Sequence, residues 1–206
     1  MSRKKLLATT LGALLAAASL AGCAESETEP TTASATPAAT APATTDAQAS
    51  EAHNDADTTF AQMMIVHHEG AIEMAELAID KAENPDVVEL AERIAQAQGP
   101  EIEKMTAWLE VWGEDVEPMD HGGMDMDGMD MNGMSQEEMM THLEGLSGEE
   151  FDAAFLEGMI AHHQGAVEMA EAELADGENP EALALAEKII SDQEAEITEM
   201  KEMLAG

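Results

Sequence analysis

The chain has 206 residues, of which 44 are Asp or Glu and only 8 are Lys or Arg, so its formal net charge is −36 at pH 7. A field of this sign repels phosphate backbones and anionic lipid surfaces and concentrates cations, which excludes nucleic acid as a partner. The single cysteine, Cys23, excludes an internal disulfide and a thiolate metal cluster within one chain.

The N-terminus has the organisation of an export signal. Basic residues 3–5 precede an apolar, Ala-rich run at 6–20, which is too short for a convincing permanent membrane span. The sequence Leu-Ala-Gly-Cys at 20–23 resembles the lipobox of bacterial lipoproteins, in which the cysteine is acylated. We therefore expect a lipoprotein signal peptide at 1–22 and a lipid anchor at Cys23, which place the protein on the extracytoplasmic face of the cell membrane. A secreted protein with an incidental cysteine is the alternative.

The segment that follows has almost no large apolar residue. Residues 23–50 are mostly Thr, Ala, Pro, Ser and Glu, a composition that cannot bury enough surface to order itself. We expect this segment to be a disordered tether, followed by a folded domain at 51–206.

An internal repeat defines the architecture of that domain. Residues 60–109 align without a gap to residues 155–204, at a constant offset that carries His67 onto His162. Each copy predicts two helices, the first at about 54–82 and again at about 149–176. Both are followed by Glu-Asn-Pro, in which Asn can cap the next helix and Pro fits its first turn. Two such amphipathic hairpins predict an all-α, antiparallel four-helix bundle with a long crossover loop.

Two histidines lie within the apolar face of the first helix of each hairpin. At about 100° per residue, they share this face with methionines that occur three residues before and seven residues after the first histidine. A thioether is a soft, neutral donor suited to Cu(I) or Ag(I), and imidazole suits copper in both oxidation states. The pattern predicts metal ligation, with Cu(I) favoured, by Met64, His67, His68, Met74, Met159, His162, His163 and Met169.

A structural role is the alternative for these histidines. They could hydrogen-bond to polar core residues while methionine fills gaps in the packing. Gln98 and its copy Gln193 lie in the apolar stripes of the second helices. These glutamines could be the hydrogen-bond partners, or they could orient ligand imidazoles.

A methionine-rich loop at 117–135 joins the two hairpins. Its methionines alternate with Asp, Gly and Asn and have neither a helical nor a strand period, which indicates a flexible, solvated segment. Met-x-Met spacing lets such a loop wrap several thioethers around one soft cation. Compositional bias is the alternative. The predicted ligands are Met119, His121, Met124, Met126, Met129, Met131 and Met134, and Met139, Met140 and His142 could extend the cluster.

At the duplicated His-His-x-Gly-Ala-x-Glu-Met-Ala stretch the chain resembles a bacterial family known as domain of unknown function 305. The resemblance covers about residues 55–204. It implies a ferritin-like four-helix bundle, often exported and in some members connected with copper handling. Glu69 is matched by Gln164, so the two copies differ at that position.

These observations favour a copper-binding lipoprotein, without catalytic activity, that sequesters copper, confers resistance to it or transfers it. Besides the metal ion, a homo-oligomer and a copper-transfer protein are the partners left open. A metal-dependent oxidase of the ferritin-like class is an alternative, although the chain has no Glu-x-x-His pair and no nucleophile beside a base. A scaffold bundle without metal is the other alternative.

Overall fold

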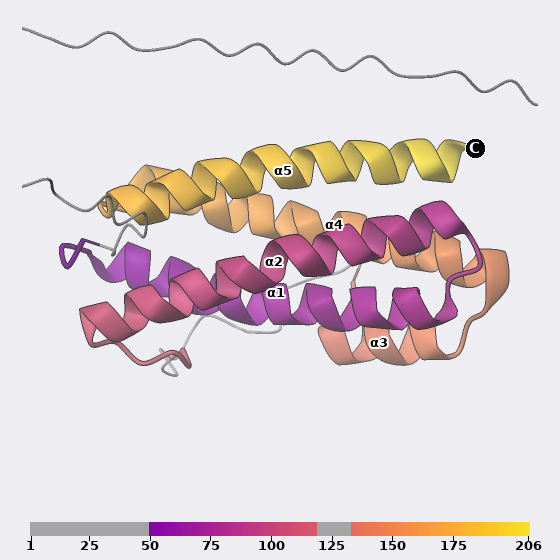
Figure 1. Ribbon diagram of the computed structural model, residues 1–206, viewed down its shortest axis with the longest axis horizontal. Coiled ribbons are helices and arrows are strands. Elements are labelled where there is room, and N and C mark those ends of the chain that lie inside the picture. The colour runs from indigo at the N-terminus through magenta and orange to yellow at the C-terminus, as the bar shows by residue number, and fades with distance from the viewer. Residues whose placement is uncertain (1–49, 119–132) are drawn as a thin grey trace, which may run out of the picture. The chain divides into compact units, whose positions relative to one another are not determined.

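The computed structural model describes residues 50–118 and 133–206, and within these ranges the chain is all-helical, without a strand (Figure 1). Four long helices form two hairpins, and a short helix lies between them in sequence. The helices are α1 (Asp55–Lys81), α2 (Pro85–Trp112), α3 (Gln136–Glu144), α4 (Gly148–Asp176) and α5 (Pro180–Ala205).

The turn within each hairpin forms as its sequence predicts. Asn84 caps α2 by accepting a hydrogen bond from the backbone N–H of Asp86, and Asn179 caps α5 through the N–H groups of Glu181 and Ala182. Proline occupies the first turn of each helix, where the missing N–H has no intrahelical partner to lose. The two hairpins are therefore encoded locally.

The two hairpins pack mainly through their first helices. α1 contacts α2, α4 contacts α5, and the hairpins meet where α1 packs against α4. In Figure 1 the four long helices run side by side and α3 lies against α1. Their apolar faces bury two clusters: one around Phe151, Phe155 and Leu90, and the other around Phe60, Trp108 and Leu109. The bundle thus consists of two duplicated hairpins, as the internal repeat predicts.

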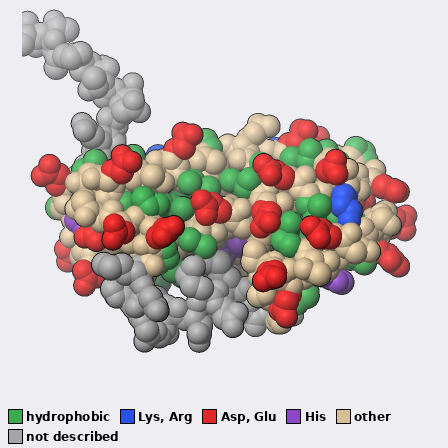
Figure 2. Space-filling view, turned by 90° about the horizontal axis from the view of Figure 1, so that it is seen from below, with side chains coloured by type: hydrophobic (Ala, Val, Ile, Leu, Met, Phe, Trp, Pro, Cys, Tyr) green, Lys and Arg blue, Asp and Glu red, His purple; other side chains and the backbone are tan. Residues whose placement is uncertain are grey.

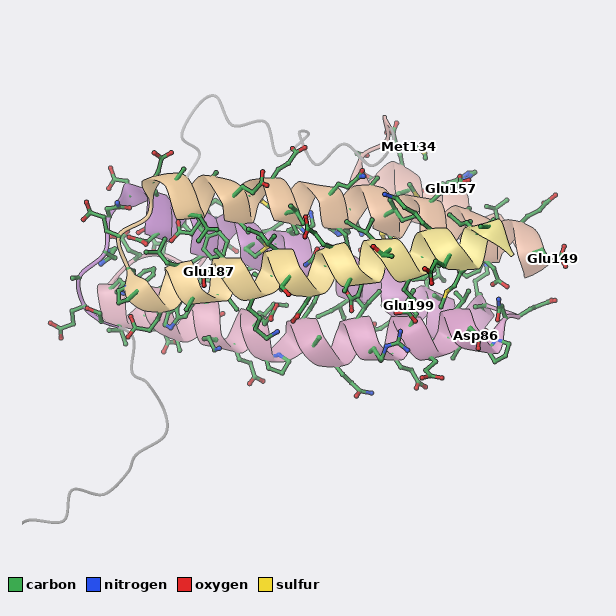
Figure 3. All side chains as sticks on the ribbon, turned by 90° about the horizontal axis from the view of Figure 1, so that it is seen from above. Asp86, Met134, Glu149, Glu157, Glu187 and Glu199 are labelled. Atoms are coloured by element: carbon green, nitrogen blue, oxygen red, sulfur yellow. The ribbon has the colours of Figure 1, made fainter. Side chains whose placement is uncertain are left out.

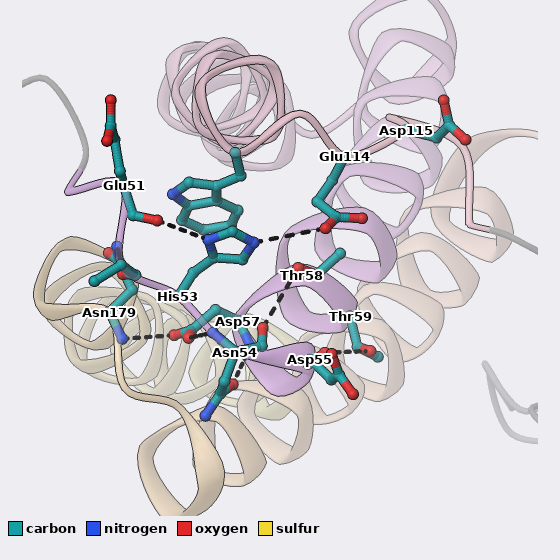
Figure 4. Close-up of polar contacts among 12 residues, drawn as sticks. Glu51, His53, Asn54, Asp55, Asp57, Thr58, Thr59, Glu114, Asp115 and Asn179 are labelled. Atoms are coloured by element: carbon teal, nitrogen blue, oxygen red, sulfur yellow. Dashed lines mark hydrogen bonds and ion pairs between the residues drawn. The ribbon is translucent and has the colours of Figure 1, made fainter.

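A pair of duplicated aspartates joins each hairpin to the turn of the other. Asp152 on α4 accepts hydrogen bonds from the backbone N–H groups of Glu83 (3.2 Å) and Asn84 (2.9 Å). Its counterpart Asp57 on α1 accepts from the N–H groups of Glu178 (3.1 Å) and Asn179 (2.8 Å) (Figure 4). These bonds satisfy backbone donors that would otherwise be orphaned at the turns, so the aspartates link the two copies of the repeat.

The two links differ in one buried carboxyl group. Glu173 faces Asp57, is 2 % exposed, and neither of its carboxyl oxygens accepts a hydrogen bond from the described residues. Burial, together with the neighbouring Asp57, raises the pKa of Glu173 to about 8. Although burial acts to raise the pKa of Asp57 too, backbone N–H donors led by that of Asn179 lower it. Glu173 is therefore the protonated member of the pair at neutral pH.

The first copy of the repeat lacks this carboxyl group. A Cβ atom at Gly177 would lie 2.3 Å from a carboxyl oxygen of Glu173, so the glycine makes room for the buried acid. At the equivalent positions the first copy has Ala78 and Ala82.

Helix α3 follows the methionine-rich segment and was not predicted. Ser135 and Glu138 form a capping box at its N-terminus, which is a Ser-x-x-Glu signal present in the sequence. Met139 is buried in the hydrophobic core, and His142 is exposed. Packing of the methionine on the bundle therefore accounts for this short helix.

The surface of the bundle carries the charge expected from the composition. Acidic side chains are spread over the face shown in Figure 2, with few basic ones among them. None of the helices in the described ranges is both long and apolar enough to cross a bilayer.

Candidate metal centre

Two buried histidines meet where the hairpins pack together. The imidazole rings of His67 on α1 and His162 on α4 lie 3.7 Å apart between centroids, with Nε2 of His67 2.8 Å from Nδ1 of His162. Both residues are 2 % exposed. A Cβ atom at Gly165 would lie 3.2 Å from Nε2 of His67, so a small residue on α4 permits this close approach.

The other two histidines each bind a carboxylate from the second helix of their own hairpin. Nε2 of His68 lies 2.9 Å from Oε2 of Glu101, and Nε2 of His163 lies 2.7 Å from Oε2 of Glu196. The rings of both histidines are buried, and so is Glu101, whereas Glu196 is partly exposed. Metal-binding histidines commonly have this arrangement, in which a carboxylate accepts the N–H of one ring nitrogen and directs the other toward the ion.

The hydrogen bonds to the glutamates leave the second ring nitrogen of His68 and of His163 buried without a partner. In the neutral tautomer that donates from Nε2 to Glu101 or Glu196, the lone pair of the ring lies on Nδ1. Neither Nδ1 atom has a hydrogen-bond partner in the described part of the chain.

The histidine pair at the hairpin interface leaves one lone pair free. Whichever ring donates in the bond between His67 and His162, one of the outer nitrogens, Nδ1 of His67 or Nε2 of His162, holds a lone pair. Both outer nitrogens are buried, and neither has a partner among the described residues. A buried acceptor without a donor costs free energy, and ligation of a metal ion would remove that cost.

Burial also keeps the central pair neutral. Desolvation, assisted by the other buried histidines, lowers the pKa of His162 to about 3 and that of His67 well below its ordinary value. A neutral imidazole has the free lone pair that ligation requires. These two rings therefore remain available as ligands without competition from protons near neutral pH.

The methionines of the same helices are distributed over both hydrophobic clusters. Met74 and Met159 belong to the cluster around Phe155, whereas Met64 lies in the cluster around Phe60, and Met169 packs at its edge. Met64, Met74 and Met159 are fully buried. The prediction that they belong to the core face is confirmed, and their ligation of an ion stays a prediction.

The remaining predicted ligands are less defined. Met134 is half-buried and packs against the core. In the described ranges no group of three or more His, Cys, Asp or Glu side chains converges to hold a metal ion, so imidazoles are available singly or in pairs. The predicted lipidation site Cys23 and the predicted loop ligands lie outside the described residues; these ligands are Met119, His121, Met124, Met126, Met129 and Met131.

Comparison with known protein families shows to which family the chain belongs. Residues 57–204 match the family described as "Domain of unknown function (DUF305)". The chain belongs to the DUF305 family. No curated protein matches it.

Solved structures of similar proteins share its fold. A protein of this family from Streptomyces coelicolor is 32 % identical, with a TM-score of 0.64, over 73 % of this chain and 92 % of that one. CopM in its Cu(II)-bound form is 36 % identical, with a TM-score of 0.60, over 72 % of this chain and 95 % of CopM. CopM is also known with Cu(I), with a TM-score of 0.55 over 71 % of this chain and 94 % of CopM at the same identity.

Two residues of this candidate metal centre were not identified from the sequence. Glu101 and Glu196 occupy equivalent positions in the two copies of the repeat, and each follows a stripe glutamine, Gln98 or Gln193, by three residues. That spacing places each glutamate on the same helix face as its glutamine and is the signal that could have revealed it. The glutamines are buried, but the partners of the histidines are the glutamates.

Proposed function

We propose that this DUF305 protein is an exported, lipid-anchored copper-binding protein that holds Cu(I) in its helical core and sequesters it or hands it on. The observation that carries this proposal is the set of buried imidazole nitrogens without hydrogen-bond partners at His67, His68, His162 and His163. The copper-bound structures of the related CopM support the choice of metal. A ferritin-like arrangement of the four long helices is part of the same proposal.

The chemistry of the donors favours Cu(I) over harder ions. Neutral imidazoles and thioethers are the nitrogen and soft sulfur ligands that this ion accepts, and no described group of three carboxylates or histidines offers the oxygen-rich site of a harder ion. The low pKa of His67 and His162 keeps both rings neutral. In this proposal the methionine-rich loop captures copper and the bundle retains it.

Anaerobic titration of Cu(I) into the full-length chain, in competition with a chromophoric chelator, tests the proposal. The double variant His67→Leu/His162→Leu should lose the ions bound by the bundle and keep those bound by the loop. A variant with serine at the methionines of 119–131 should show the opposite. His53→Ala is the matched control, because His53 lies at the end of the bundle, stacked on Trp112 (Figure 4).

The outcome distinguishes the copper proposal from a purely structural role. If the His67→Leu/His162→Leu chain binds as much Cu(I), and as tightly, as the unaltered chain, the bundle is not the copper site. Binding weaker than millimolar by the unaltered chain would overturn the function as a whole.

Membrane fractionation tests the anchor separately. In the native host the unaltered chain should sediment with membranes, and Cys23→Ser should move it to the soluble fraction. A Cys23→Ser chain that stays with membranes would contradict lipid anchoring at this residue.

A further inference from the structure

A cavity of about 230 Å³ lies between the second helices of the two hairpins, α2 and α5. These two helices pack on each other far less closely than the helices within each hairpin do. Ion pairs bridge them instead, from Arg93 to Glu199 (2.5 Å) and from Lys188 to Glu101 (2.9 Å). Figure 3 shows Glu199 on the side of α5 that faces α2. The cavity thus lies between two helices that are connected by ion pairs.

The polar residues that line the cavity come in equivalent pairs from the two copies of the repeat, and they include hydrogen-bond acceptors without a donor. Gln98 and Glu101 from α2 face the cavity together with their counterparts Gln193 and Glu196 from α5. Both glutamines are 3 % exposed, and the Oε1 atom of each has no partner in the described part of the chain. Buried amide oxygens without a donor have an affinity for cations, because they stabilise positive charge and have lost water as a partner.

The cavity leads from the surface toward the buried histidines. At its outer side the lining residues Ala97, Asp192 and Ala195 are exposed. At its inner side the carboxylates of Glu101 and Glu196 contact the rings of His68 and His163, at 2.9 and 2.7 Å. The carboxylates of the lining therefore contact two of the four proposed copper ligands, each of which directly follows His67 or His162 in the sequence.

The lining is suited to passage of a cation rather than to its retention. The carboxylates at the cavity do not converge with a third acidic or histidine side chain into a group that could chelate an ion, within the described ranges. Acidic walls still raise the local concentration of cations. Lys188 forms ion pairs with two residues of the lining, Glu101 and Asp192, and its positive charge opposes that attraction.

We propose that this cavity is the entrance through which a soft monovalent cation reaches the buried histidines, with Gln98 and Gln193 as positioning residues along the way. The proposal rests on the copper-binding function proposed above. Removal of both amide oxygens should slow uptake, since the ion then crosses an apolar stretch, and should leave the final affinity unchanged. Removal of the positive charge of Lys188 should accelerate uptake.

Stopped-flow uptake of Ag⁺ tests this in the full-length chain with serine at the methionines of 119–131, so that the bundle alone is observed. In Gln98→Leu/Gln193→Leu we expect the association rate to fall at least tenfold, with stoichiometry and equilibrium affinity unchanged. In Lys188→Gln we expect the rate to rise severalfold, with a steeper dependence on salt. The matched controls are Gln96→Leu and Lys201→Gln, which change exposed side chains of the same helices.

The results separate the entrance from the copper site itself. Uptake at the unaltered rate in Gln98→Leu/Gln193→Leu, with binding intact, overturns the entrance and leaves the function standing. A change in affinity that accounts for the whole change in rate overturns it as well, because the glutamines would then be ligands. If the bundle takes up no Ag⁺, both the proposed function and the proposed entrance are overturned. If the double glutamine variant does not fold, the surface variant Lys188→Gln decides the question by its rate.

Discussion

Replacement of Glu173 by glutamine should abolish a dependence of stability on pH that the buried carboxyl group imposes. In the folded state the pKa of Glu173 lies at about 8 instead of the ordinary 4.5. Between these values the folded chain holds a proton that the unfolded chain has released, so stability falls as pH rises from 4.5 to 8 and is constant beyond. At about 1.4 kcal/mol per pH unit, the loss by pH 7 is about 3 kcal/mol.

Urea unfolding of the unaltered chain and of Glu173→Gln, followed by circular dichroism between pH 4 and pH 8, measures this effect. The amide has no proton to release, so the stability of Glu173→Gln relative to the unaltered chain should increase by about 3 kcal/mol between pH 4 and pH 7. Asp57 titrates in the opposite direction but is present in both chains. Glu171→Gln, which alters an exposed acid of the same helix, is the control. Parallel pH profiles for Glu173→Gln and the unaltered chain would refute the assignment of the proton to Glu173.

Three further substitutions test a link between the hairpins, a glycine beside Glu173 and the cap of α3, and urea unfolding is the assay for the first two. Asp152→Ala leaves two backbone N–H groups of the opposite turn unsatisfied and should destabilise the fold by about 3 kcal/mol; an effect below 1 kcal/mol would contradict the link between hairpins. Gly177→Ala should cost about 2 kcal/mol by crowding both the side chain and the backbone carbonyl of Glu173, and adding Glu173→Ala should recover part of the loss, whereas additive losses would refute the crowding of the side chain. Ser135→Ala should weaken α3 by about 1 kcal/mol, visible as faster hydrogen exchange confined to that helix, and unchanged exchange there would show that the cap contributes nothing.

The features that the sequence predicted are local or repeated. The turns at Asn84 and Asn179 follow from capping and proline geometry within a few residues, and the periodicity of apolar residues placed His67 and His162 on buried faces. The duplication then implied two equivalent hairpins. Such features need no knowledge of which helix faces which.

The features that were missed depend on packing between helices. The contact of His67 with His162 arises only when α1 lies against α4, and the binding of His68 by Glu101 requires the rotation of α2 that directs an otherwise ordinary glutamate inward. Gln98 and Gln193, which the sequence suggested as possible hydrogen-bond partners of the histidines, are therefore not those partners. α3 forms because Met139 packs against the core. The sequence did not predict this helix because it follows a methionine-rich segment that indicates no regular structure.

The central claim is that the histidines in the core hold a soft metal ion, and a crystal structure of the protein loaded with Cu(I), with anomalous diffraction measured at the copper edge, tests it most directly. The account predicts an anomalous peak within about 2 Å of a ring nitrogen of His67 or His162, at a nitrogen that lacks a hydrogen bond in the metal-free bundle. Copper found only outside the helical core, with these nitrogens unligated in a fully loaded protein, would contradict it.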